Sequence, residues 1–323
     1  MNLLDAIREA GIVGAGGAGF PTHVKLKAKA EWFIVNAAEC EPLIDTDKYL
    51  CRTYADRIVA AAVIVAGHLQ AEHTVIALKK KYRAEIDALR AAIDKAGAAI
   101  EICEMGVFYP AGDEQTMVQF VTGKTVPERG LPLDVGAVVD NVGTLLGIYD
   151  AMTEGKSVSS KYLSVVGEVR EPIMIHTPIG TPITQCIEAA KPHLTDYAVI
   201  VGGPMMGRVL SDREAIRNAV VTKTTGNLIV LPRDHYLITR AGRPMAHSRT
   251  GADGVHSVPD VYRSVPALSN RTSDSSAHGH AQPVSRTDDF VERRISPRLW
   301  RCGKLLQLRR VRDVRLPDGI VAT

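Results

Sequence analysis

The chain has 323 residues, of which 46% are hydrophobic, 23% charged and 5% aromatic. This is an ordinary globular composition with room for two domains. The longest apolar run, residues 58–67, is far shorter than the roughly 20 residues of a membrane helix. The N-terminus has no basic segment followed by an apolar run, and the five cysteines show neither disulfide nor metal-ligand spacing. We therefore expect a cytoplasmic protein without a membrane span.

The net charge of +3 conceals a change of composition near residue 240. Residues 1–240 carry 25 basic and 28 acidic side chains, whereas residues 241–323 carry 14 basic and 8 acidic ones. Of those 14 basic residues, 13 are arginine. The break predicts a boundary there, followed by a disordered tail over residues 241–323.

Hydrophobic periodicity predicts alternating helices and strands in the first half of the chain. We expect helices over residues 3–9, 54–68, 83–95 and 141–152, and strands over residues 32–35, 74–78, 99–103 and 135–139. Helices of this length between short apolar strands indicate an α/β fold with a doubly wound, mainly parallel sheet. We assign this domain to residues 1–158.

The pattern then changes to short strands punctuated by glycine and proline. Strands are expected over residues 162–166, 173–177, 198–201 and 228–231, with one helix over residues 183–190. These elements predict a second, small domain over residues 159–240.

A glycine-rich loop, GAGGAGFP, occupies residues 14–21. Its glycines can reach positive φ and bring consecutive backbone N–H groups to a phosphate. A tight surface turn would explain the same residues. The usual dinucleotide fingerprint fits poorly, because it needs a strand before the loop and a helix opening from it. Here a helix precedes the loop and Pro21 ends it.

Three further segments place polar side chains at strand ends or helix starts. Glu39 and Glu41 follow the strand at 32–35, where ligands of parallel sheets usually bind, although a solvated acidic loop is an alternative. Residues 109–114, YPAGDE, open a helix. Asn141 and Thr144 would lie at a helix N-terminus, where they could bind an anion or simply cap the helix.

In this order, GAGGAGFPTHVKL, NAAECEP, YPAGDEQ and DNVGTL resemble the flavin domain found in the C subunit of the Rnf complex. More distantly, they resemble the flavin subunit of respiratory NADH dehydrogenase. The resemblance covers residues 1 to about 240 and is closest to the cobalamin reductases of bacterial microcompartments, which are electron-transfer flavoproteins. Residues 165–183 resemble the β-grasp ligand-binding domain of the same proteins, so a β-grasp fold is implied for residues 159–240.

The resemblance implies an enzyme that transfers hydride from NADH to FMN and passes electrons to iron–sulfur centres. The residues implied at FMN are Gly14, Gly16, Gly17, Gly19 and Lys25, with Asn36 near its ring and Asn141 and Thr144 at its phosphate. Those implied at NADH are Phe20, Glu39 and Glu41, and Glu114 is implied as a further cofactor-binding residue. Two positions depart from the family pattern, since Ala38 replaces an aspartate of the respiratory subunit and Asp140 replaces an asparagine.

The resemblance leaves the electron acceptor open between a corrinoid enzyme, a ferredoxin and a membrane complex. It leaves the location open between the general cytoplasm, the interior of a microcompartment and the inner face of the membrane.

Family members continue with two four-cysteine motifs for 4Fe–4S clusters, but residues 241–323 contain one cysteine, so this chain cannot ligate either cluster. We interpret the tail as a shifted reading frame of the same gene. A codon that ends in TG and precedes a codon starting with C or T contains a cysteine codon one base later. Suitable positions are Val255, Val258, Val261 and Val265, which give C-x2-C-x2-C-x3-C, and Leu305, Leu308, Val311 and Leu316, which give C-x2-C-x2-C-x4-C.

Other interpretations remain open. The tail could be a genuine arginine- and serine-rich extension that binds nucleic acid. It has few aromatic residues for base stacking, so we expect no nucleic-acid partner. A simple nicotinamide dehydrogenase would need a general acid or base, for which His23, His68 and His176 are available.

Overall fold

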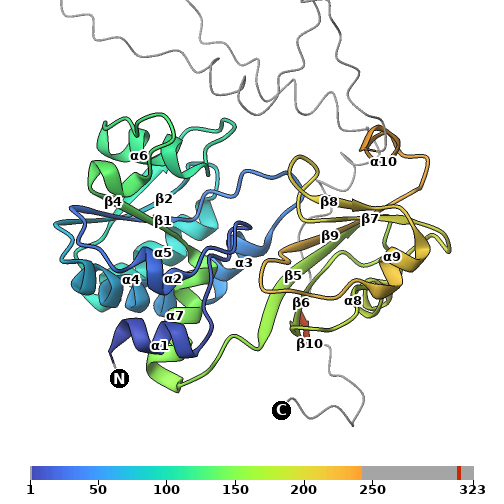
Figure 1. Cartoon of the computed structure of the whole chain (residues 1–323), viewed down its shortest axis with the longest axis horizontal. Helices are drawn as coiled ribbons and strands as arrows, with labels where there is room; N and C mark the ends of the chain where they lie inside the picture. The colour runs from blue at the N-terminus through green and yellow to red at the C-terminus, as the bar shows by residue number, and fades with distance from the viewer. Residues whose placement is uncertain (1, 242–310, 314–323) are drawn as a thin grey trace, which may run out of the picture.

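The structure is a computed structural model that describes residues 2–241 and 311–313, arranged as two α/β units side by side (Figure 1). The helices of the first unit are α1 (Leu3–Glu9), α2 (Thr22–Lys25), α3 (Thr46–Thr53), α4 (Ala55–Leu69), α5 (Arg83–Ala96), α6 (Glu114–Thr122), the 3-10 helix η1 (Pro132–Val135) and α7 (Val142–Glu154). Its strands are β1 (Trp32–Asn36), β2 (His73–Lys79), β3 (Glu101–Met105) and β4 (Ala137–Asn141).

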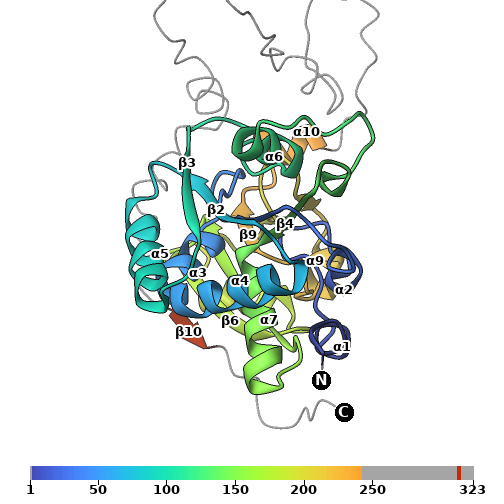
Figure 2. The same ribbon diagram turned by 90° about the vertical axis from the view of Figure 1, so that its left-hand side faces the viewer.

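The four strands of the first unit form a parallel sheet in the order β3-β2-β1-β4. Side chains of β1 alternate between two apolar layers: Phe33 and Val35 pack with α3, α4, α5 and α7, whereas Ile34 packs with α6 on the other face. Figure 2 shows these helices on the two sides of the sheet. The predicted doubly wound parallel sheet is confirmed, and its near-continuous burial is typical of a sheet covered on both faces.

The strand order creates a switch point between β1 and β4. The chain moves from β1 to β2 and β3 in one direction, and β4 then returns to the opposite side of β1. Asn36 and Asn141 are register partners at the carboxyl ends of these two strands. Ligands of open parallel sheets bind in the crevice outside such a switch point.

The second unit contains β5 (Ser160–Gly167), β6 (Ile173–Pro178), α8 (Ile183–Ala189), β7 (Ala198–Val201), β8 (Arg208–Leu210), α9 (Arg213–Asn218), β9 (Asn227–Leu231) and α10 (Tyr236–Ala241). Its mixed sheet has the order β10-β6-β5-β9-β7-β8, where β10 is Val311–Asp313. β5 runs parallel to β9 and antiparallel to β6, and α8 packs on one face through Ile183 and Ile187. A mixed sheet packed against a helix in this way agrees with the β-grasp fold that the resemblance implies.

Several boundaries differ from the predicted ones for local reasons. β4 begins two residues later than expected because residues 132–135 form η1, which Gly136 ends in a left-handed conformation. α3 is a separate helix that the sequence pattern does not predict. Most of the predicted disordered tail lies outside the described residues. Its one described strand, β10, pairs with β6. The domain limits at residues 158 and 240 stay predictions.

No helix within residues 2–241 combines the length and apolar character needed to cross a membrane.

Candidate functional site

A cavity of about 620 Å³ lies between the two units. The first unit lines it with the glycine loop, the acidic loop and the first half of α7. The second unit lines it with the 156–162 linker and with loops at residues 201–208 and 219–226. This volume is within the roughly 300–1,000 Å³ of small-molecule sites.

Hydrogen bonds join the two units around this cavity, among them one between the hydroxyl groups of Tyr54 and Tyr162 at 2.6 Å. Thr46 Oγ1 donates to the carbonyl of Gly226 at 2.7 Å, and the backbone N–H of Met205 donates to Glu41 Oε2 at 3.0 Å. Lys223 Nζ donates to the carbonyl of Gly11. These bonds hold residues of both units next to the cavity.

The glycine loop is closed on itself and tied to α7. Gly14 N–H donates to the carbonyl of Phe20 at 2.8 Å, and Ala15 N–H donates to Thr144 Oγ1 at 3.0 Å. Between these anchors, the N–H groups of Gly16 and Gly17 form no hydrogen bond within the described part of the chain. Both residues line the cavity, so their N–H groups are available to an anionic ligand.

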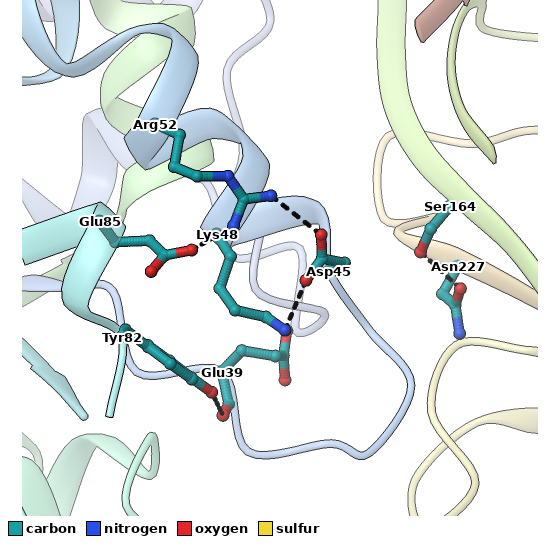
Figure 3. Close-up of polar contacts among 8 residues, drawn as sticks. All are labelled: Glu39, Asp45, Lys48, Arg52, Tyr82, Glu85, Ser164 and Asn227. Atoms are coloured by element: carbon teal, nitrogen blue, oxygen red, sulfur yellow. Dashed lines mark hydrogen bonds and ion pairs between the residues drawn. The ribbon is translucent and has the colours of Figure 1, made fainter. Parts of the chain in front are cut away.

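The acidic loop is pinned by charged and aromatic side chains of the first unit (Figure 3). The Arg52 guanidinium bridges Asp45 and Glu85, and Lys48 Nζ pairs with Asp45 at 2.5 Å. The Tyr82 hydroxyl donates to the carbonyl of Glu39 at 3.2 Å. These contacts hold the loop against α5 and direct residues 39–47 to the cavity.

Glu39 is a cavity carboxyl whose pKa is raised by burial. Burial raises its pKa to about 8, with a smaller contribution from the nearby Asp47 carboxyl. The N–H of Glu41 donates to Glu39 Oε1 at 2.9 Å, which opposes the shift. The raised pKa favours the protonated form of Glu39, which can donate a hydrogen bond into the cavity.

Glu41 connects the acidic loop to the second unit. Its Oε2 accepts from Met205, and Gly203 leaves the room for this contact, because a Cβ on that glycine would lie 2.1 Å from Oε2. Its other oxygen, Oε1, is buried and has no hydrogen-bond partner within the described residues. Burial also raises the pKa of Glu41.

Lys25, Glu114 and Asp140 form a charged cluster next to the switch point. Lys25 Nζ donates to Glu114 Oε1 at 2.8 Å and to the carbonyl of Val139 at 2.7 Å, and it lies 3.8 Å from Asp140. Asp140 is 2% exposed, and burial raises its pKa to about 7 despite Lys25. Its Oδ2 has no hydrogen-bond partner among the described residues.

Asp140→Asn is expected to stabilise the protein above pH 7. Between the pKa of the unfolded state, near 4, and that of the folded state, the unfolded chain loses this proton while the folded chain keeps it. The free energy of unfolding of the natural chain therefore falls as pH rises. Asparagine does not titrate, so the free energy of unfolding of the variant does not fall in this way. Its excess over that of the natural chain grows with pH and reaches on the order of 2 kcal/mol above pH 7.

Urea unfolding at pH 5 and pH 8 measures this difference, with the exposed Asp87→Asn as the matched control. A variant that loses stability at pH 8 would show that attraction to Lys25 outweighs the cost of burying the charge.

Asn36 and Asn141 are engaged by protein groups. Asn36 Nδ2 donates to the carbonyl of Gly112 at 2.8 Å and its Oδ1 accepts from Ala38. Asn141 Oδ1 caps α7 by accepting from Gly143 N–H at 2.8 Å, and its Nδ2 donates to Asp47 at 2.6 Å. The capping alternative considered for Asn141 is thus present in the structure.

The structure brings only part of the predicted site to the cavity. Of the twelve predicted residues, those that line it are Gly16, Gly17, Glu39, Glu41 and Thr144, whereas Gly14, Gly19, Phe20, Lys25, Asn36, Glu114 and Asn141 lie outside its lining. Sequence reasoning missed the lysines of the second unit that also line it, Lys156, Lys161 and Lys223. These lysines lie in two short segments rich in lysine and hydroxyl residues, KSVSSK and TKTTG. Neither segment matches a known motif that would have predicted a site.

The three histidines considered as the general acid or base of a simple dehydrogenase lie outside the lining of the cavity. None of His23, His68 and His176 belongs to its lining, and His68 contacts the carbonyl of Leu26 at 3.1 Å. Within the described residues there is also no group of three or more His, Cys, Asp or Glu side chains suited to a metal ion. These residues therefore do not fit the iron–sulfur clusters that the family implies.

The Nuo51 FMN-binding domain family matches residues 7–150. Cobalamin reductase PduS of Citrobacter freundii is 40% identical over 237 residues, which cover 73% of this chain and 51% of the reductase. The C subunit of the proton-translocating ferredoxin:NAD(+) oxidoreductase complex of Clostridium ljungdahlii is 37% identical over 211 residues, or 64% of this chain and 46% of that protein. The chain thus spans about half the length of the curated relatives it matches.

A solved structure shares the fold. A chain of an NAD+-reducing NiFe hydrogenase in the H2-reduced state superimposes with a TM-score of 0.64 and 25% identity, covering 72% of this chain and 47% of that chain. These likenesses confirm the resemblance to cobalamin reductases and to the C subunit of the Rnf complex that the four motifs indicate.

Proposed function

Because residues 7–150 match the Nuo51 FMN-binding domain family, we propose that this chain binds FMN and oxidises NADH as the flavin-bearing part of an electron-transfer flavoprotein. The observation that carries the proposal is the cavity between the two units, which is lined by the Glu39 carboxyl and by Gly16 and Gly17, whose N–H groups have no partner among the described residues.

The residues of the first unit fit a flavin nucleotide. Gly16 and Gly17 offer backbone donors without side chains, and a Cβ at Gly17 would meet no protein atom within 4 Å. Lys25 and Asn36 lie outside the lining of the cavity and bind protein groups, so their role at the flavin remains a prediction of the resemblance. When bound, FMN supplies the acceptor for a hydride from NADH and can release electrons singly.

The acidic loop is proposed to bind the nicotinamide nucleotide. In its protonated form Glu39 can donate to a carbonyl or hydroxyl group, and the Glu41 carboxyl, which also lines the cavity, can accept from a hydroxyl group. A carboxylate suits a ribose because its oxygens accept hydrogen bonds from the ribose hydroxyl groups. Phe20, which is 49% exposed, provides an apolar surface near the entrance of the glycine loop.

The double substitution Glu39→Ala with Glu41→Ala is expected to weaken NADH binding about tenfold or more and FMN binding much less. Each lost hydrogen bond to a charged or buried group costs about 1.5–3 kcal/mol, and the glycine loop stays intact. Stopped-flow reduction at varied NADH measures the first quantity, and flavin fluorescence titration measures the second.

The matched control for this test is Glu72→Ala with Glu101→Ala, two exposed glutamates outside the cavity. Unchanged NADH dependence in the Glu39/Glu41 variant would remove the acidic loop from the nucleotide site.

The onward partner is proposed only by chemical class. The relatives are named a cobalamin reductase and a part of a ferredoxin:NAD(+) oxidoreductase complex, so a corrinoid enzyme, a ferredoxin or a membrane complex would receive the electrons. We place the protein in the cytoplasm, including the interior of a microcompartment or the inner face of the membrane. Comparing cob(II)alamin and ferredoxin as acceptors for the NADH-reduced protein would separate the first two partners.

A further inference from the structure

Two lysine- and hydroxyl-rich segments form the side of the cavity that belongs to the second unit. Residues 156–161, KSVSSK, lead from α7 into β5, and residues 222–226, TKTTG, lead into β9. All of these residues line the cavity. The first unit contributes the carboxyl groups of Glu39, Glu41 and Asp47 instead, so the two sides of the cavity carry opposite kinds of charged group.

The three lysines of this wall differ in their partners. Lys223 donates to the carbonyl of Gly11, and Lys156 pairs with Glu154. The Lys161 side chain is half-buried, and its ammonium group has no hydrogen bond or ion pair within the described part of the chain. Burial lowers its pKa, and the nearby Asp47 carboxyl opposes this effect. Burying an ammonium group without a partner costs free energy. An anionic ligand beside Lys161 would offset this cost.

The hydroxyl groups of this wall are ordered for ligand binding. Thr222 N–H donates to Thr225 Oγ1 at 3.0 Å, and the Thr222 hydroxyl lies 3.2 Å from that of Thr224. The loop is further fixed by Thr46, whose hydroxyl donates to the carbonyl of Gly226. Donors on a rigid loop lose little entropy when they bind a phosphate.

The turn at the start of α7 offers fewer free donors and cations to a phosphate than the lysine-containing wall does. Both polar ends of the Asn141 side chain are used by Gly143 and Asp47. The neighbouring Asp140 has no free cation beside it among the described residues, since Lys25 also binds Glu114 and Val139. A phosphate near this turn therefore needs a cation from elsewhere, and the unpaired lysine that lines the cavity is Lys161.

We propose that the second unit supplies a phosphate subsite of this cavity, with Lys161 as its principal cation and residues 156–161 and 222–226 as its hydrogen-bonding walls. The inference rests on the proposed function and extends it to a nucleotide held by both units. The ligand class is the phosphate end of a cofactor, either the flavin phosphate or the pyrophosphate of the nicotinamide dinucleotide.

The phosphate subsite is tested in the full chain with the variants Lys161→Met and Lys161→Arg. The control is Lys29→Met, which changes an exposed lysine outside the cavity. Two ligand pairs distinguish the source of the phosphate: FMN against riboflavin, and NADH against a phosphate-free dihydronicotinamide. Lys161→Met is expected to weaken one phosphate-bearing ligand about tenfold, equivalent to about 1.4 kcal/mol, and to leave its phosphate-free analogue unchanged. Lys161→Arg should retain most of the affinity.

Equal affinities of Lys161→Met and the natural chain for both FMN and NADH would overturn the subsite. If the natural chain binds no flavin at all, the proposed function fails, and the subsite is judged separately by calorimetry with pyrophosphate. Pyrophosphate should then bind the natural chain and the Lys29→Met control alike, and Lys161→Met more weakly. No difference among the three would overturn the subsite by this route as well.

Discussion

Replacing Gly17 with valine is expected to weaken FMN binding at least about 100-fold, or about 2.7 kcal/mol, while the chain still folds. Gly17 has φ +116° and lines the cavity, and an added Cβ would meet no protein atom within 4 Å. The new methyl groups would therefore occupy ligand space. The φ value is also one that valine rarely adopts, so the N–H group would turn away from its present direction.

The control for this variant is Gly97→Val. Gly97 has φ +57°, has no atom within 4 Å of an added Cβ, and caps α5 outside the cavity. Both variants should lose stability through backbone strain, of about 1–2 kcal/mol, but only Gly17→Val should lose FMN. Flavin fluorescence titration together with thermal unfolding measures both effects, and unchanged FMN affinity in Gly17→Val would exclude the glycine loop from the site.

Restoring the reading frame between about residues 239 and 255 is expected to produce a protein with eight additional cysteines and about eight irons. The cysteines would arise at Val255, Val258, Val261 and Val265 and at Leu305, Leu308, Val311 and Leu316. The first set has the spacing of a bacterial ferredoxin motif. The frame-restored protein should be brown and should pass electrons from NADH to a one-electron acceptor, whereas the present chain should relay them poorly.

Iron analysis and visible spectra of the anaerobically reconstituted protein measure this outcome, with the present chain as the control. The nucleotide sequence decides it in advance. Stop codons throughout the neighbouring frame, or the absence of cysteine codons at these eight positions, would show that the tail is a genuine extension.

The regular elements of the first unit could be predicted because local signals agree with the fold. The strand at 32–35 and the helices at 3–9 and 83–95 are found within one residue of their predicted ends. These segments combine apolar periodicity with a glycine or a polar stop, such as Gly97 after α5. β4 begins later than predicted because the short turn of η1 has no periodic signal of its own.

The site could be predicted only where a motif marks it. Gly16 and Gly17 of the glycine loop lie at the cavity, and so does Glu39, whose position beyond a parallel strand indicates a ligand site. Lys161 could not be found in this way, because it comes from the second unit and meets the cavity only through tertiary packing. The same holds for the bond between Glu41 and Met205, which joins residues 164 positions apart.

The most direct test of the central claim is an anaerobic titration of the purified chain with FMN, followed by addition of NADH. We predict that one FMN binds per chain without a covalent bond and that NADH bleaches the flavin band near 450 nm (about the position common to flavins). A chain that binds no FMN, or that binds FMN whose band NADH leaves unchanged, would contradict the assignment of this protein as an NADH-oxidising flavoprotein.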